Sequence, residues 1–208
     1  IQSMNNLSLS LKELGKIDEA IHVLKNAISL KPDYPELNYN LSYYYNLKGK
    51  FNKGLELYEW RTKITKKLAR PPRKKMIWDG SEPLTSKNFL VYEEQGIGDI
   101  IQFCRYLPML KKRGAKVTFK VTKKLHAILR TLDHEIVFTN SFPDEKLIDY
   151  EAPLLSLPFL FETNLRNIPN KIPYLFANQN RVLSYANVLD KKSLILVSVG
   201  KELKINLI

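Results

Sequence analysis

In the first 60 residues, apolar side chains recur three or four positions apart, which is the spacing of one face of an α-helix. Leu7, Leu11 and Leu14 form the first stripe, and Gly15 follows it, where a helix can end in a left-handed turn. A second stripe, made of Ala20, Leu24, Ala27 and Ile28, ends before Pro32, which cannot continue a helix. The pattern predicts two antiparallel helices.

The same pattern then returns. Asn6-Leu7 recurs as Asn40-Leu41 and Gly15-Lys16 recurs as Gly49-Lys50, both 34 residues later. A helical hairpin with a 34-residue period is typical of tetratricopeptide repeats (TPRs), so we expect residues 1–65 to form TPR hairpins. About two copies are present, fewer than the three that usually make a stable array. We therefore expect further repeats before Ile1, docking on the following domain, or both.

From residue 87 the pattern changes, because short apolar runs alternate with helical ones. Strands are expected at 88–92, 116–121, 135–138, 146–150 and 193–200, and helices at 99–114, 123–133 and 180–189. Alternation of this kind predicts a parallel sheet wound in the Rossmann manner. The expected fold class is thus α+α/β, with a linker at 66–86, a Rossmann-like domain at 87–199 and a tail at 200–208.

The composition limits the class of protein and the cellular compartment that we expect. The chain is 44% hydrophobic and 26% charged, which is ordinary for a globular protein, and it lacks an apolar run long enough for a membrane span. Cys104 is the single cysteine, which excludes an intramolecular disulfide and fits the cytoplasm. The three histidines are scattered, so no metal site is expected.

The net charge of +12 is unevenly distributed. Residues 61–75 carry eight Lys or Arg and no acid, so they supply two-thirds of the excess. A nucleic-acid-binding fold more often spreads its cations over a face with interleaved aromatic residues. We interpret the run as a solvated linker or an edge that faces anions, and a nucleic-acid partner is not expected.

Two glycines and an acid mark the turn that follows the first expected strand. Gly96 and Gly98 give the backbone freedom for a sharp turn, and Asp99 is placed to cap the next helix. A dinucleotide fingerprint would need a third glycine where Ile101 stands, and no Walker sequence follows. Spacing alone therefore does not favour phosphate binding at this turn.

The expected helix after the turn has two chemically different sides. Its apolar side consists of Ile100, Phe103, Cys104 and Leu107. Its polar side consists of Asp99, Gln102, Arg105 and Tyr106. Polar groups at the carboxyl edge of a parallel sheet can hold a polar substrate, although an exposed helix face is also polar for solubility alone.

Several sequence blocks together resemble one family. They are Tyr58-Glu-Trp-Arg61, Trp78-Asp-Gly80, LVYEEQGIGDIIQFCRYLP at 90–108, PLLSLP at 153–158 and IPYL at 172–175. This order resembles bacterial TPR proteins fused to a glycosyltransferase of the heptosyltransferase-like superfamily. The resemblance implies the GT-B architecture, with two Rossmann-like domains facing a cleft, and sugar transfer from a nucleotide-activated donor without a metal.

The resemblance also implies roles for individual residues. Asp99 matches the aspartate that serves as catalytic base toward the acceptor hydroxyl. The neighbours expected on the acceptor side are Glu94, Gln95, Gly96, Gly98, Gln102, Arg105 and Tyr106. The expected acceptor is a protein or a glycan. A nucleotide-sugar donor is expected for a full-length relative, and no cofactor is expected in this chain.

After residue 199 the resemblance ends, because the family continues into a donor domain whereas this sequence has nine further residues. We therefore expect an acceptor-side half with little or no transferase activity of its own. The alternative function is a protein-interaction module in which the concave TPR surface binds a peptide. The residues expected there are Asn6, Tyr39, Asn40 and Tyr43.

Three further residues have simpler interpretations. Trp78 is expected to anchor the linker by packing rather than to stack on a sugar. Cys104 is expected to be a small core residue. Ser156 could reach the cleft, but nothing near it in the sequence would activate it as a nucleophile.

Overall fold

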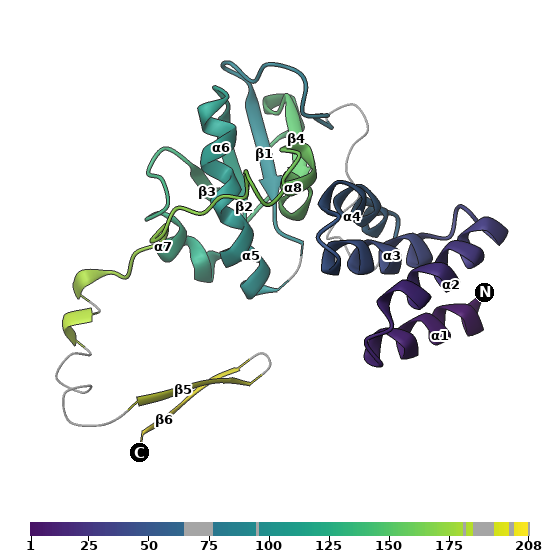
Figure 1. Ribbon diagram of the computed structural model, residues 1–208. Coiled ribbons are helices and arrows are strands. Elements are labelled where there is room, and N and C mark those ends of the chain that lie inside the picture. The colour runs from purple at the N-terminus through teal and green to yellow at the C-terminus, as the bar shows by residue number, and fades with distance from the viewer. Residues whose placement is uncertain (65–76, 95, 181, 185–193, 200–201, 208) are drawn as a thin grey trace.

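The computed structural model describes residues 1–64, 77–94, 96–180, 182–184, 194–199 and 202–207. Most of the basic run at 61–75 and most of the helix expected at 180–189 lie outside these residues, as does Gln95. Within them, a helical N-terminal region leads into a unit built on a four-stranded parallel sheet (Figure 1).

The N-terminal region is two helical hairpins and a closing turn. Helices α1 (Gln2–Glu13) and α2 (Ile17–Leu30) form the first, and α3 (Pro35–Leu47) and α4 (Phe51–Tyr58) the second, followed by the 3-10 helix η1 (Glu59–Lys63). Gly15 and Gly49 adopt φ of 74° and 69° between the helices of each pair, a left-handed conformation that favours glycine. The predicted hairpins and their turns are confirmed.

Small residues set how closely these helices pack. Ala20, Leu24 and Leu37 are fully buried between the two hairpins. A Cβ built on Gly54 of α4 would lie 2.5 Å from the Cγ atom and 3.0 Å from the backbone N of Asn46 on α3. The glycine is therefore what lets α3 and α4 approach each other.

The sheet has the order β3-β2-β1-β4, and all its strands are parallel. Its strands are β1 (Asn88–Tyr92), β2 (Lys116–Lys120), β3 (Val137–Thr139) and β4 (Tyr150–Pro153). The chain moves outward from β1 through β2 to β3, then returns to the other side of β1 to form β4. The strand order reverses between β1 and β4, so a ligand crevice would be expected beyond the carboxyl ends of these two strands.

The connecting helices are shorter than predicted. In place of one helix at 99–114 there are α5 (Ile97–Phe103), η3 (Cys104–Tyr106) and α6 (Leu107–Lys112). Pro108 falls in the first turn of α6, where its missing N–H does no harm, whereas inside one long helix it would break the hydrogen-bond ladder. The segment expected as a helix at 123–133 contains η4 (Lys123–Leu125) and α7 (His126–Leu129).

The strand expected at 146–150 needs correction, because the 3-10 helix η5 (Glu145–Leu147) and the start of β4 are found there. The block PLLSLP at 153–158 contains the end of β4, the 3-10 helix η6 (Leu154–Ser156) and the start of α8 (Leu157–Leu160). Short apolar runs suit either state, so periodicity alone could not separate them.

The core of the sheet unit begins earlier than residue 87. Trp78 is 1% exposed, and its indole N–H donates to the backbone oxygen of Glu82 at 3.0 Å. Its ring packs edge-on against Phe89 of β1 and Phe161 after α8. The prediction that Trp78 is a packing anchor is confirmed.

The last predicted strand does not extend the parallel sheet. β5 (Leu194–Val199) pairs antiparallel with β6 (Glu202–Leu207) in a separate two-stranded ribbon, which lies apart from the other strands (Figure 1). The segment expected as a divergent tail is therefore a strand. Its alternation of Leu203, Ile205 and Leu207 with polar residues has the period of a strand, which explains the pairing.

Candidate functional site

The crevice expected beyond β1 and β4 is occupied by an arginine of this chain. Arg61, from η1, is fully buried. Its Nε and Nη2 groups donate to the two carboxylate oxygens of Glu94 at 2.8 and 2.9 Å. Glu94 comes two residues after β1, and its Oε1 also accepts the backbone N–H of Leu155, just after β4, at 2.9 Å. The helical region is thus joined to the sheet at its switch point.

Two further side chains complete this network, and one of them, that of Glu59, is 27% exposed. Arg61 Nη1 donates to Glu59 Oε1 at 2.7 Å, and Nη2 donates to Ser156 Oγ at 2.7 Å. Ser156 in turn donates to the other oxygen of Glu59 at 2.7 Å. Ser156 therefore lies beyond the carboxyl end of β4, where it bridges an arginine and a glutamate.

The network has one cation and two carboxylates, and this affects the protonation of its members. Burial raises the pKa of Glu59, against the opposing effects of Arg61 and Ser156. Burial alone would lower the pKa of Arg61, but the charges of Glu59 and Glu94 outweigh it and raise the pKa. Arg61 therefore stays charged, whereas burial disfavours the ionised form of Glu59.

The resemblance placed Glu94 on the acceptor side, but its side chain is fully buried and bound on both oxygens. The adjacent Glu93 is also engaged, because it accepts hydrogen bonds from Lys120 Nζ at 3.0 Å and from the backbone N–H of Thr122 at 2.9 Å. Both acids after β1 thus contribute contacts inside the protein. An acceptor role for Glu94 remains a prediction.

Asp99 lies in the first turn of α5, but it is not the cap of that helix. The N-cap is Gly96, the helix starts at Ile97, and the cap position makes no side-chain hydrogen bond. Gly96 has φ of −68° and ψ of 168°, an extended conformation open to any residue, so the expected need for glycine there is not observed. Asp99 is partly exposed in the first turn of the helix, where the helix dipole stabilises a negatively charged carboxylate.

Tyr39 and Tyr43 of α3 form an aromatic cluster with Tyr58 at the end of α4. The ring centroids of Tyr39 and Tyr43 are 5.0 Å apart, and those of Tyr39 and Tyr58 are 5.5 Å apart. The hydroxyl groups of Tyr39 and Tyr43 share a hydrogen bond. Tyr43 is 43% exposed whereas Tyr39 is 6% exposed, so Tyr43 carries the accessible surface of the cluster.

This cluster connects the two kinds of predicted site. Burial raises the pKa of the Tyr43 hydroxyl, and the contributing charges include that of Asp99. The Tyr43 ring also packs against Tyr58, whose ring lies 4.6 Å from the guanidinium of Arg61. The cluster therefore adjoins the Arg61 network, which holds the end of the repeats against the sheet.

The remaining two peptide-binding candidates lie on neighbouring helices. Asn40 of α3 donates from Nδ2 to Oδ1 of Asn5 on α1 at 2.8 Å. Asn6, the next residue on α1, is exposed and accepts a hydrogen bond from Gln2 at 3.3 Å. Amide side chains thus occur on the first helix of each hairpin, α1 and α3.

The polar side predicted for the helix after β1 is only partly observed. Gln102 is exposed, whereas Tyr106 is 3% exposed and stacks on Phe161 in the core, so its assignment to that side is wrong. Arg105 donates from Nη1 to the backbone oxygen of Pro169 at 3.1 Å. The switch from α5 to η3 turns the later residues away from the direction that an unbroken helix would give them.

The buried side of the helix was predicted correctly. Ile100, Cys104 and Leu107 are at most 2% exposed and belong to the core of the sheet unit. Burial raises the pKa of the Cys104 thiol to about 12. The cysteine is therefore a core residue without a thiolate at neutral pH.

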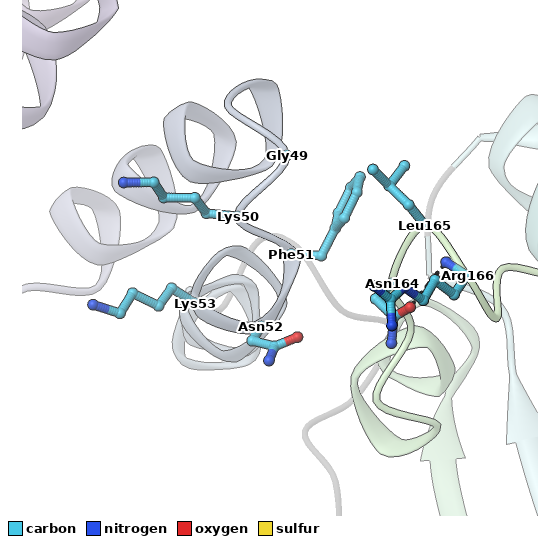
Figure 2. Close-up of a pocket in the computed structure, with 8 residues that line it drawn as sticks. All are labelled: Gly49, Lys50, Phe51, Asn52, Lys53, Asn164, Leu165 and Arg166. Carbon is cyan, nitrogen blue, oxygen red and sulfur yellow. Dashed lines mark hydrogen bonds between the residues drawn. The ribbon is translucent and has the colours of Figure 1, made fainter.

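An open crevice of about 660 Å3 lies between the turn before α4 and the loop after α8. Figure 2 shows Phe51 and Leu165 next to each other across it, while the ammonium groups of Lys50 and Lys53 point away from Arg166. Charged groups do not converge there, so this crevice offers no arrangement for chemistry.

Neither a metal site nor a membrane span is found in the described ranges. No group of three His, Cys, Asp or Glu side chains there is close enough to hold a metal ion. None of the helices observed there is long and apolar enough to cross a bilayer.

Comparison with known proteins identifies the helical region. A family model described as TPR repeat matches residues 9–49, which run from α1 to the turn after α3. No curated protein sequence matches the chain. The chain is therefore a TPR-containing protein with a parallel-sheet unit, and TPRs commonly bind protein partners.

Sequence reasoning missed the role of Arg61, although it had noted the block containing it. Arg61 and Glu94 are 33 residues apart in sequence, and their pairing depends on docking between two units. The available signal was the sequence Tyr58-Glu59-Trp60-Arg61, in which two charged residues alternate with two aromatic residues at the end of the repeats.

Proposed function

We propose that this chain binds a protein partner on the TPR surface that carries Asn6, Asn40 and Tyr43. One observation carries the proposal: the ring of Tyr43 on that surface packs against Tyr58, and the Tyr58 ring lies 4.6 Å from the guanidinium of Arg61, which joins the repeats to the sheet. A partner lying along α1 and α3 would therefore extend toward the carboxyl edge of the sheet. The TPR match at residues 9–49 supports the choice of a polypeptide partner.

The chemistry of this surface suits an extended peptide. Asparagine side chains can both donate to and accept from a peptide backbone, and the exposed ring of Tyr43 supplies apolar contact. The carboxylate of Asp99 adds a negative charge at one end. Such a surface would favour peptides that carry a hydroxyl or a cationic side chain near that end.

The proposal can be tested with peptides selected from a displayed random library against the whole chain. Selected peptides should bind Tyr43→Ala and Asn6→Ala variants about tenfold more weakly, because hot-spot contacts of this kind are worth about 1–2 kcal/mol. Asn26→Ala, at an exposed position on α2, is the control and should bind as the parent does. Equal binding by the parent and Tyr43→Ala would contradict the proposal.

A second proposal is that the partner is the acceptor of a sugar, with Asp99 as the base. It rests on the resemblance and on the position of Asp99, which is partly exposed in the first turn after β1. The helix N-terminus favours the ionised carboxylate, which is the form that can take a proton from a hydroxyl. The sugar would come from a nucleotide-activated donor bound by a second domain.

This second role needs a chain that includes a donor domain. There, Asp99→Asn should abolish transfer and leave thermal unfolding unchanged, because the amide keeps the shape but cannot act as a base. Turnover at the parental rate would remove Asp99 from this role. Peptide binding would be unaffected by that result, so the two proposals can be separated.

A further inference from the structure

A second cavity lies in the sheet unit, next to α6 and the segment 166–176. Its volume is about 510 Å3, within the usual range for small-molecule sites. Three parts of the chain line it: the η3–α6 segment, the loop after α7, and the segment 166–176 itself.

Hydrogen bonds hold this covering segment in place at both ends. Arg105 Nη1 donates to the backbone oxygen of Pro169 at 3.1 Å. The Tyr174 hydroxyl donates to the backbone oxygen of Ile101 at 3.1 Å, and the backbone N–H of Phe176 donates to Thr131 Oγ1 at 3.0 Å. The cavity is therefore bounded by attached walls rather than by a detached loop.

The charges that line the cavity are strongly unequal. Four cationic residues contribute, namely Arg105, Lys112, Arg166 and Lys171, against the single acid Asp133. Both carboxylate oxygens of Asp133 already accept hydrogen bonds from Lys111, at 2.8 and 2.7 Å. Within the part of the chain that the structure describes, no salt bridge engages Lys112, Arg166 or Lys171.

Arg105 is the most constrained of these cations. Its Nε group donates to the backbone oxygen of Gln102 at 2.7 Å, and its guanidinium carbon lies 4.3 Å from the centre of the Tyr174 ring. Among the described residues no hydrogen bond is formed by its Nη2 group. A guanidinium fixed in this way loses little conformational entropy when it binds an anion.

Apolar side chains also line the cavity, with Met109 and Pro108 from α6, Leu132 after α7, and Ile168 and Phe176 from the covering segment. We propose that this cavity binds a small organic phosphate, with the phosphate at Arg105 and Lys112 and a flat apolar group against the apolar lining side chains. Arg and Lys together are the usual protein partners of phosphate oxygens. The proposal goes beyond the proposed function, because Asp99 does not line the cavity.

Calorimetric titration of the whole chain with 1-naphthyl phosphate tests the proposal. This compound should bind at least about tenfold more tightly than inorganic phosphate, because its rings bury apolar surface. It should also bind more tightly than 1-naphthol, which lacks the charge. Asp99→Asn should bind it as the parent does, which separates this cavity from the acceptor role proposed for Asp99.

Matched variants separate a site from diffuse positive charge. Arg105→Gln should weaken binding about tenfold or more, since hydrogen bonds to charged groups are worth about 1.5–3 kcal/mol. Because this change also removes the contact to Pro169, Lys112→Ala provides a second variant and should weaken binding about fivefold. Lys124→Ala removes the same charge from an exposed position outside the cavity and should have no effect. Equal losses in Lys112→Ala and Lys124→Ala, or 1-naphthyl phosphate binding no better than inorganic phosphate, would overturn the proposal.

Discussion

Arg61 and Glu94 form a two-bond ion pair, at 2.8 and 2.9 Å, in which both side chains are fully buried. It joins the last turn of the TPR region to the residue pair that follows β1. In open parallel sheets, the space beyond the carboxyl ends of strands at a switch point commonly receives a ligand. Here an arginine of the same chain lies in that space, so its role at this place is to orient two units.

Removing Arg61 should therefore destabilise the whole chain. Arg61→Met leaves Glu59 and Glu94 close together without a cation, and breaking a buried pair in this way costs about 3–5 kcal/mol. The free energy of unfolding from urea denaturation measures the loss. Lys87→Met is the control, because the Lys87–Asp149 pair is half-exposed at 3.6 Å and should contribute less than about 1 kcal/mol. Equal losses in the two variants would contradict the prediction.

Glu59 should make the stability of the chain depend on pH. Burial, opposed by Arg61, raises its pKa in the folded state, so the folded protein favours the protonated form. The resulting stabilisation is fully present below the unfolded pKa of about 4.3 and is lost as pH rises through the higher folded pKa. Glu59→Gln cannot ionise and lacks this dependence.

The measurement is the free energy of unfolding of parent and Glu59→Gln at several pH values between about pH 5 and pH 7, a range above the unfolded pKa. The parent should lose stability relative to the variant as pH rises. A difference that stays constant, or that grows in favour of the parent, would show that burial does not dominate at Glu59.

Cys104 should be unreactive in the folded protein. Its thiol is fully buried, and burial raises its pKa to about 12, so the nucleophilic thiolate is scarce at pH 8. The rate of its reaction with a disulfide reagent should rise by orders of magnitude when denaturant is added. A native rate equal to the unfolded one would mean that the helix carrying Cys104 is not packed as described.

The helical region was predictable from sequence because its determinants are local. The 34-residue offset between Gly15 and Gly49 located both turns, and each glycine adopts the left-handed conformation expected of it. The apolar side of the helix after β1 was predictable for the same reason, since Ile100 and Cys104 follow one helical period.

Three features were not predicted, and two of them depend on contacts between separate segments. The helix cap was assigned to Asp99, but the backbone enters the helix three residues earlier, at Gly96. Arg61 and Glu94 are ordinary charged residues until docking buries them together. The pairing of β5 with β6 was missed because residues 200–208 were interpreted as a tail, although Leu203, Ile205 and Leu207 alternate with polar residues as in a strand.

Replacing glycine with alanine should have opposite effects on stability at Gly54 and at Gly98. Gly54→Ala places a Cβ 2.5 Å from Asn46 Cγ and 3.0 Å from its backbone N, so α4 must move away from α3. Such overpacking costs about 1–3 kcal/mol. Gly98→Ala adds a Cβ within α5, where no described atom lies within 4 Å, and alanine is the better helix former by about 1 kcal/mol. The midpoint of thermal unfolding should therefore shift down for Gly54→Ala and up for Gly98→Ala. A midpoint that is unchanged or raised in Gly54→Ala would mean that the α3–α4 contact does not depend on the missing side chain.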